Sequence, residues 1–127
     1  MRQQFSNQEI LEYATSLHEN FLENSKDITL PIKINFYLQK NMKNFIEAAK
    51  EVEASRLKIG EKYGVYNPKD SSYLIQDEDK LKLAQKELQE LMSLDQIIEV
   101  YPISLEDLQN VDLTVAQMNA MLFMIEE

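Results

Sequence analysis

The chain of 127 residues is 44% hydrophobic and 28% charged, a composition typical of a single globular domain, 1–127, and not of a disordered segment. It contains no cysteine, which excludes disulfides and thiolate metal sites, and no apolar run of the roughly 18–20 residues that a membrane span requires. The net charge of −9 lies entirely in residues 65–127, where four Lys and Arg residues stand against thirteen Asp and Glu residues, so direct binding to nucleic-acid phosphates is not expected.

A first helix is predicted over residues 7–24. Ser6 and Glu9 have the spacing of a capping box, in which each side chain accepts a hydrogen bond from the backbone N–H of the other residue. Apolar residues then recur at helical spacing on one face, which requires a packing partner. They are Ile10, Ala14, Leu17 and Phe21.

His18 is the single histidine and lies at the border of that face. An imidazole acts as a general base beside a substrate and an orienting carboxylate, and Glu19 and Glu23 are near it in sequence. An enzyme that uses His18 is therefore one hypothesis. No motif places a serine or cysteine nucleophile next to it, so the preferred interpretation is a surface histidine in a protein that is not an enzyme.

The longest predicted helix covers residues 31–63, and its apolar seam organises the rest of the chain. Pro31 suits the first turn, and Gly64 is expected to end the helix in the left-handed conformation. The seam advances in alternating steps of four and three residues, which suits a helix packed alongside at a shallow angle. It consists of Leu38, Met42, Phe45, Ala49, Val52, Arg56, Ile59 and Tyr63. We expect Arg56 to pair with a carboxylate of a neighbouring helix, and the other faces, which interleave Lys and Glu, to be solvated.

Two segments have the composition of short strands. The stretch 64–76 ends in a β-like run, Tyr73–Gln76, and residues 96–103 are rich in Ile, Val and Tyr. Pro102 cannot donate to a ladder, so the second strand is an edge strand or ends there. We expect the segment around Leu74 to pair with residues 96–103 as a two-stranded antiparallel ribbon.

A third helix is predicted over residues 77–93. Asp77, Glu78 and Asp79 occupy its first turn, where negative charge stabilises the helix dipole. Carboxylates also suit a hard cation, but no glycine turn and no distal bidentate carboxylate follow, so the capping role is preferred. The apolar stripe of this helix is Leu81, Ala84, Leu88 and Leu91.

Residues 105–126 are predicted to form the C-terminal helices. Ser104 with Asp107, and Thr114 with Gln117, have the spacing of N-terminal caps. The last helix, Val115 to about Ile125, is apolar nearly all round. It therefore either packs in the core or contacts a partner.

Four stretches of the sequence together resemble a family of small uncharacterised proteins encoded by tailed phages and prophages of Gram-positive bacteria. They are FSNQEILEYATSLHE, LPIKINFYLQKNMKNF, RLKIGEKYG and ISLEDLQNVDLTVAQMNAMLFMIEE. The resemblance implies a phage or prophage origin and a location in the cytoplasm of the host cell. It implies no catalytic residues.

The fold predicted from these elements is mainly α. A long antiparallel helical hairpin, 31–63 against 77–93, is braced by N- and C-terminal helices, with a short two-stranded β ribbon at one end. The second helix of the hairpin is half as long as the first, so part of the seam stays uncovered. An uncovered seam favours a homodimer through helix 31–63 or through the final helix.

The predicted function is protein–protein interaction in an assembly or accessory role, without enzymatic activity, cofactor, metal, membrane or direct nucleic-acid contact. The protein partner is of phage or host origin. An alternative is an acidic inhibitor whose carboxylates imitate phosphates in the groove of a host nucleic-acid-binding protein. The candidate partner-binding residues are Asp77, Glu78, Asp79, Met121, Phe123 and Met124.

Overall fold

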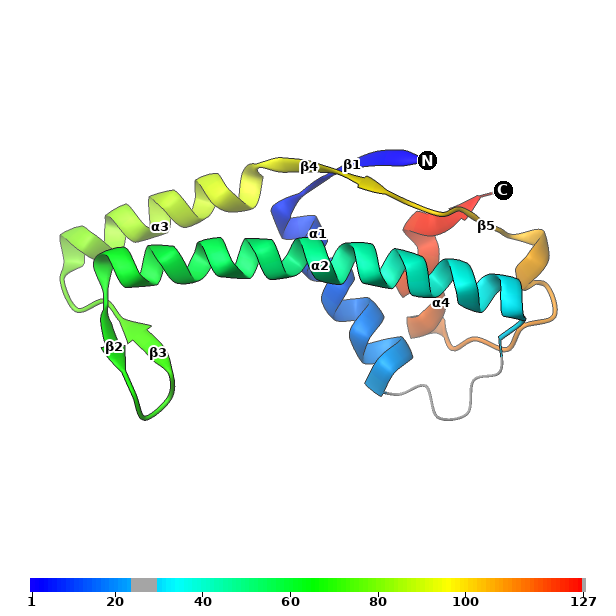
Figure 1. Cartoon of the computed structure of the whole chain (residues 1–127), viewed down its shortest axis with the longest axis horizontal. Coiled ribbons are helices and arrows are strands. Elements are labelled where there is room, and N and C mark those ends of the chain that lie inside the picture. The colour runs from blue at the N-terminus through cyan, green and yellow to red at the C-terminus, as the bar shows by residue number, and fades with distance from the viewer. Residues whose placement is uncertain (24–29, 127) are drawn as a thin grey trace.

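The computed structural model describes residues 1–23 and 30–126 of the chain. This part is mainly helical, as the sequence predicts, with small two-stranded sheets. Helix α2 (Ile32–Tyr63) is the longest element and runs the length of the molecule (Figure 1). The predicted first helix is divided into α1 (Asn7–Leu17) and a π-helical segment, η1 (His18–Glu23), and Asn24 lies outside the described residues.

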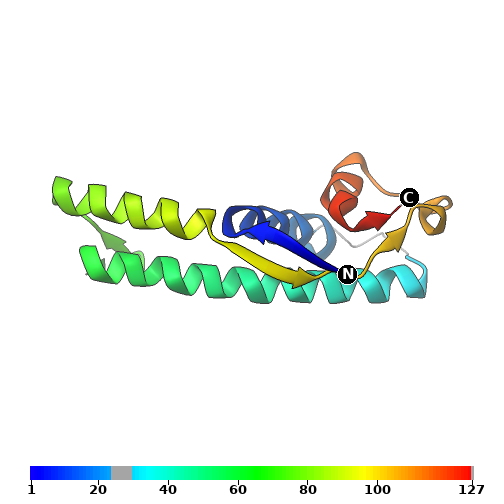
Figure 2. The same cartoon turned by 90° about the horizontal axis from the view of Figure 1, so that it is seen from above.

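The other helices pack around α2 and α1. Helix α1 crosses α2 near its middle, and α3 (Glu78–Ser93) runs back along the second half of α2 (Figures 1 and 2). Helix α4 (Val115–Met121) packs against α1 and η1. The short 3-10 helices η2 (Glu106–Leu108) and η3 (Leu122–Met124) belong to the C-terminal segment. Capping boxes begin α1 and α4 at Ser6 and Thr114, which confirms these two predicted caps. The predicted cap of Ser104 with Asp107 is wrong, because Ser104 is extended and pairs with Glu126, and η2 begins after Leu105 without a side-chain cap.

The described residues form three pairs of strands, two of which connect distant parts of the chain. The pairs are β1 (Arg2–Ser6) with β4 (Asp95–Glu99), antiparallel; β2 (Val65–Asn67) with β3 (Ser72–Leu74), antiparallel; and β5 (Ile103–Ser104) with β6 (Ile125–Glu126), parallel. The predicted last helix is therefore too long, because Ile125 leaves the helical conformation to pair with Ile103.

The predicted ribbon between the segment around Leu74 and residues 96–103 is wrong. Leu74 pairs with Val65 in a local hairpin whose turn holds Ser71 at a positive φ of 54°. Strand β4 pairs instead with β1, which lies at the other end of the sequence. A tight turn gives β3 a nearer partner, whereas the polar sequence of β1, RQQFS, carries almost no strand signal.

The hydrophobic core lies beside the first half of α2 and is centred on aromatic rings. The ring centroids of Phe5 and Phe45 are 5.0 Å apart, and Phe123 lies 4.8 Å from Phe45 and 4.6 Å from Tyr13. These contacts join β1, α1, α2 and η3 in one cluster. The large side chains buried around it include Ile10, Leu17, Ile34, Leu38, Val100 and Ile103.

Met121 and Met124 belong to this core. Their exposures are 0% and 1%, so of the two alternatives for the last helix the core applies to them, and their assignment as candidate partner-binding residues is wrong. Phe123 is half-buried in the aromatic cluster. One side of the last helical turns thus packs inward against α1 and the aromatic cluster, while Val115 and Leu122 on the same turns stay exposed.

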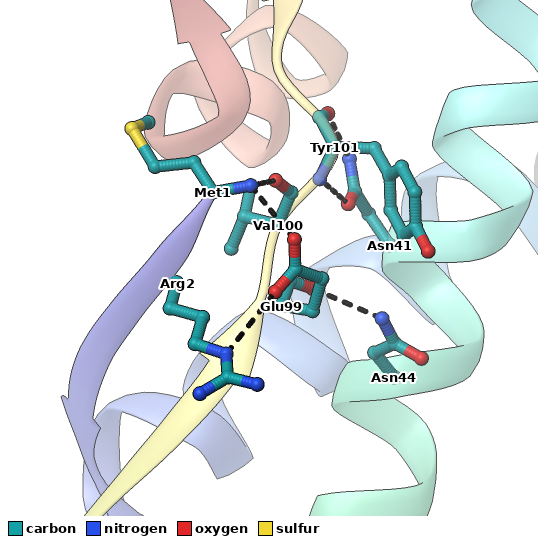
Figure 3. Close-up of polar contacts among 7 residues, drawn as sticks. All are labelled: Met1, Arg2, Asn41, Asn44, Glu99, Val100 and Tyr101. Carbon is teal, nitrogen blue, oxygen red and sulfur yellow. Dashed lines mark hydrogen bonds and ion pairs between the residues drawn. The ribbon is translucent and has the colours of Figure 1, made fainter.

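A buried asparagine fixes α2 to the chain that follows β4 (Figure 3). Asn41 is 0% exposed, and its Nδ2 donates to the carbonyl oxygen of Tyr101 at 2.9 Å while its Oδ1 accepts from the Tyr101 N–H at 2.7 Å. One turn later, Asn44 donates to the carbonyl oxygen of Glu99 at 2.9 Å. On the opposite side of that strand, the amino group of Met1 donates to Glu99 Oε1 at 2.9 Å. The side-chain amides of Asn41 and Asn44 therefore make the backbone hydrogen bonds that a third strand would make along this edge of the chain.

Helix α2 ends at Gly64 for a reason other than the one expected. Its φ of −113° and ψ of 174° are extended, so the predicted left-handed conformation is wrong. A Cβ atom at Gly64 would lie 2.9 Å from the carbonyl oxygen of Gly60 and 3.1 Å from Cβ of Tyr73. Glycine is needed here because the carbonyl oxygen of Gly60 and the side chain of Tyr73 both lie too close for a Cβ atom.

Candidate interaction site

The second half of α2 projects beyond the core as a thin arm (Figures 1 and 2). We define the arm as residues Glu53–Tyr63 of α2 together with β2, β3 and α3. The buried residues of α2 run from Ile34 to Val52, and Ala84 is the buried residue of α3. The arm is therefore two helices thick, with a hairpin at its end, and most of its side chains reach solvent.

Large apolar side chains are exposed along the arm. They are Leu57, Val65, Tyr66, Leu74, Leu81 and Leu83, with exposures from 40% for Leu81 to 72% for Val65. Two packed helices bury one stripe on each, so apolar residues outside these stripes remain in water. Large apolar side chains left in water on a projecting part of the fold are candidates for contact with another molecule.

An ion pair connects α2 to α3 within the arm. Lys62 Nζ donates to Glu87 Oε1 at 2.8 Å. This hydrogen bond raises the pKa of Lys62 above its ordinary value of 10.5 and lowers the pKa of Glu87 below 4.5. Arg56, which we expected to pair with a neighbouring helix, lies 3.4 Å from Glu53 of its own helix instead. That prediction is wrong because Glu53, one turn earlier, offers the nearer carboxylate.

A groove of about 550 Å³ lies between α1 and α2, where the arm meets the core. Its floor is apolar and includes small side chains, while charged groups stand at its rim. The lining residues are Ala14, Thr15, His18 and Glu19 on one wall and Ile46, Ala49, Lys50, Glu53, Ala54 and Leu57 on the other. The groove can therefore accept apolar groups that are flanked by charge.

His18 and Glu19 lie on the α1 side of this groove, and both are exposed. Thr15 adds a hydroxyl to the same wall. The side chain of Glu23, the other candidate carboxylate, lies outside the described residues. The structure thus brings the predicted imidazole and one of its two carboxylates to the rim of an apolar groove.

The acidic triplet lies exposed at the start of α3, at the far end of the arm (Figure 1). The carboxylate of Asp77 accepts hydrogen bonds from the backbone N–H groups of Asp79 at 2.9 Å and Lys80 at 3.3 Å. This confirms the predicted capping role of Asp77. Glu78 and Asp79 extend the negative surface around this cap.

Sequence reasoning missed the groove. Apart from Ala49, which belongs to the predicted seam, the α2 residues that line it lie on faces that we expected to be mixed, solvated surfaces. The signal was present in the recurrence of Ile46 and Leu57 on one side of the helix, with Ala49 and Ala54 between them. The point at which α1 crosses α2 decides which face of α2 lines a groove. The sequence pattern does not reveal that crossing point.

Within residues 1–23 and 30–126, no group of three or more His, Asp or Glu side chains is placed to hold a metal ion. In the same residues, every helix falls short of the combined length and apolar character that crossing a membrane demands. Comparisons of the chain with protein-family models, with curated proteins and with solved structures found no match.

Proposed function

We propose that this chain is a non-enzymatic protein that works by binding another protein, with the arm as its main contact surface. The observation that carries the proposal is the set of large apolar side chains that the arm exposes, among them Val65, Leu74 and Leu83. In this proposal the antiparallel hairpin of α2 and α3, braced by α1 and the C-terminal segment, is a support. It holds those side chains away from the core, where a partner can reach them.

The energetics favour a partner that covers the arm. Complete burial of a Val or Leu side chain contributes about 1.5–3 kcal/mol relative to leaving it exposed. A partner that buries several of these side chains would offset a large part of the entropic cost of association. The exposed side chains of the arm are not buried in the isolated chain, so a partner that covers them would gain this free energy of burial. This supports the arm as a contact surface.

The biological setting of the proposal comes from the sequence resemblance. We place the protein among those of phages or prophages, acting in the cytoplasm of the host cell in an assembly or accessory role. The partner is then a phage or host protein. The acidic surface of residues 65–127, with its excess of nine negative charges, keeps such a protein from binding nucleic acid non-specifically.

Affinity capture from phage-infected host cells tests this proposal. The bait is compared with a variant that carries Leu74→Ser and Leu83→Ser on the arm, and with a control that carries Val115→Ser, an exposed apolar residue outside the arm. The wild type and the control should retain the same partner, and the arm variant should lose it. Circular dichroism checks that all three proteins are folded. Equal capture by all three would contradict the arm as the contact surface.

The acidic inhibitor is the second candidate, and the exposed triplet at residues 77–79 favours it. The variant Asp77→Asn, Glu78→Gln and Asp79→Asn removes three charges while Asn remains a good N-cap, so α3 should persist. If the carboxylates occupy a phosphate-binding groove, binding to the captured partner should weaken and its salt dependence should become shallower. If neither the affinity for the partner nor its dependence on salt concentration changed, the three carboxylates would not contact the partner, and their role would be limited to capping α3.

A further inference from the structure

We propose that helix α3 is a hinged strap. It separates from α2 at a lower cost in free energy than global unfolding, while its C-terminal end stays attached and the core remains folded. The proposal goes beyond the contact surface described above, because it concerns the isolated chain with no partner bound. It comes from a difference between the two ends of α3: buried hydrogen bonds fix one end, and partly exposed contacts hold the other.

Few buried side chains hold α3 to α2. Of its 16 residues the structure buries one, Ala84, whereas α1, with 11 residues, buries four. On the facing helix the last buried residue is Val52, and Ile59 and Tyr63 beyond it are half-buried. Buried apolar area supplies most of the free energy that holds two helices together, so α3 is held less firmly than the helices of the core.

Most other contacts of the arm are exposed to water. The ion pair of Lys62 with Glu87 leaves their side chains 59% and 33% exposed, and exposed ion pairs contribute little to stability. Strands β2 and β3 have three residues each and no buried side chain, and a two-stranded hairpin of this kind is marginal on its own. A helix of the length of α3 is likewise marginal once it leaves its packing partner. We therefore expect these contacts to be lost together.

The opposite end of α3 is fixed by Asn7, which is 4% exposed. The Asn7 N–H donates to the carbonyl oxygen of Leu94 at 2.8 Å, and its Nδ2 donates to the carbonyl oxygen of Leu91 at 2.7 Å. Its Oδ1 accepts from Gln96 Nε2 at 2.7 Å. These bonds connect the last turn of α3 and the start of β4 to the first turn of α1, and β4 itself pairs with β1. The opening should therefore end near Leu94.

Opening uncovers apolar residues inside the arm. These residues are buried or half-buried in the closed arm, namely Ile59 and Tyr63 on α2 and Ala84 and Leu88 on α3. A partner that covers them binds the open state better than the closed state, and it therefore raises the population of the open state. The strap thus makes the inner surface of the arm accessible without unfolding the core.

Hydrogen exchange of the full chain, followed residue by residue by NMR, tests the proposal. The backbone amides of α3 should have protection factors at least about tenfold lower than those of α1 and of the first half of α2. The boundary between the two classes should fall near Leu94, so that the amides of β4 exchange with the core. Equal protection in α3 and in the core would overturn the proposal, because the chain would then unfold as one unit.

Variants in the core and in the strap should act differently. Asn41→Ala weakens the core, so it should raise the exchange rates of core amides by about a hundredfold and leave those of α3 unchanged. Asn44→Ala, which removes one hydrogen bond to Glu99, is a milder variant that should show the same selectivity. Ala84→Gly weakens the strap and should raise the exchange rates of α3 by about fivefold or more. It should raise those of the core by the same factor, since the contacts of the strap are also lost in global unfolding.

Two results would contradict an opening of α3 by itself. One is faster exchange of α3 in the core variants by the factor seen for the core amides. The other is wild-type exchange of α3 in Ala84→Gly. These measurements use the chain alone, so their outcome does not depend on whether the capture experiment finds a partner for the arm.

Discussion

Asn41 offers the sharpest test of how the core end of this fold is held together. Its side-chain amide makes two hydrogen bonds to the backbone of Tyr101, at 2.9 and 2.7 Å, in a position with 0% exposure. Asn41→Ala removes both bonds at once. It leaves the N–H and the carbonyl oxygen of Tyr101, which is half-buried, without these partners.

The expected cost follows from those two backbone groups. An unsatisfied buried polar group costs about 1–3 kcal/mol, so the pair should lower the free energy of unfolding by about 3 kcal/mol or more. That is a large share of the roughly 5–15 kcal/mol by which domains are stable. For a domain of this length it corresponds to a fall in Tm of roughly 10–15 °C.

Urea denaturation followed by circular dichroism measures this loss. Asn44→Ala is the matched control, because Asn44 makes one hydrogen bond, to Glu99, and is only partly buried. The control should lose about 1 kcal/mol or less. If Asn41→Ala lost no more stability than the control, the two bonds to Tyr101 would not stabilise the fold as argued.

Gly64→Ala should destabilise the fold by about 1–3 kcal/mol, because the new Cβ would lie 2.9 Å from the Gly60 carbonyl oxygen; an unchanged urea midpoint would contradict that close approach. The pair of Lys62 and Glu87 should stabilise the arm between acid and strongly basic pH. The pKa of Glu87 is lowered on folding, so its contribution to stability is present above pH 4.5 and is lost as the pH falls through the folded pKa. The pKa of Lys62 is raised on folding, so its contribution is present below pH 10.5 and is lost as the pH rises through the folded pKa. Lys62→Met should therefore differ from wild type in thermal unfolding at pH 7 and differ less at pH 3; an equal difference at both would exclude the ion pair as the cause. Ser6→Ala should cost about 1 kcal/mol by removing one half of a capping box, and a wild-type midpoint would show that the box is dispensable.

Local rules predicted the parts of this fold that depend on neighbours in sequence. The caps at Ser6 and Thr114 follow from spacings of three residues, and the structure confirms them. The long helix begins and ends within one residue of the predicted bounds, since its apolar seam and its flanking Pro31 and Gly64 are all local signals. Such features are set by hydrogen bonds that close within a single turn.

Non-local contacts account for most of the errors. The pairing of β1 with β4 depends on the aromatic cluster around Phe5, and the polar residues beside Phe5 give no hint of it. Met121 and Met124 have the same apolar character whether they face the core or a partner, so periodicity alone does not assign them. The groove likewise arises only where α1 crosses α2. In each case the deciding quantity is a contact between residues far apart in sequence.

The strand pair β1–β4 also has a consequence for how the chain is made. Ribosomes synthesise β1 about 90 residues before β4, so at roughly 5–20 residues per second its hydrogen-bonding partner appears some seconds later. During that delay the arm, whose contacts lie closer in sequence, can assemble first, while the backbone of β1 waits with an open edge. Nascent chains that are translated side by side on one messenger RNA would then each expose an unpaired β1 strand, and these strands could pair with one another between chains. The speed of translation and the supply of chaperones, and not stability alone, would set how much protein reaches its native state.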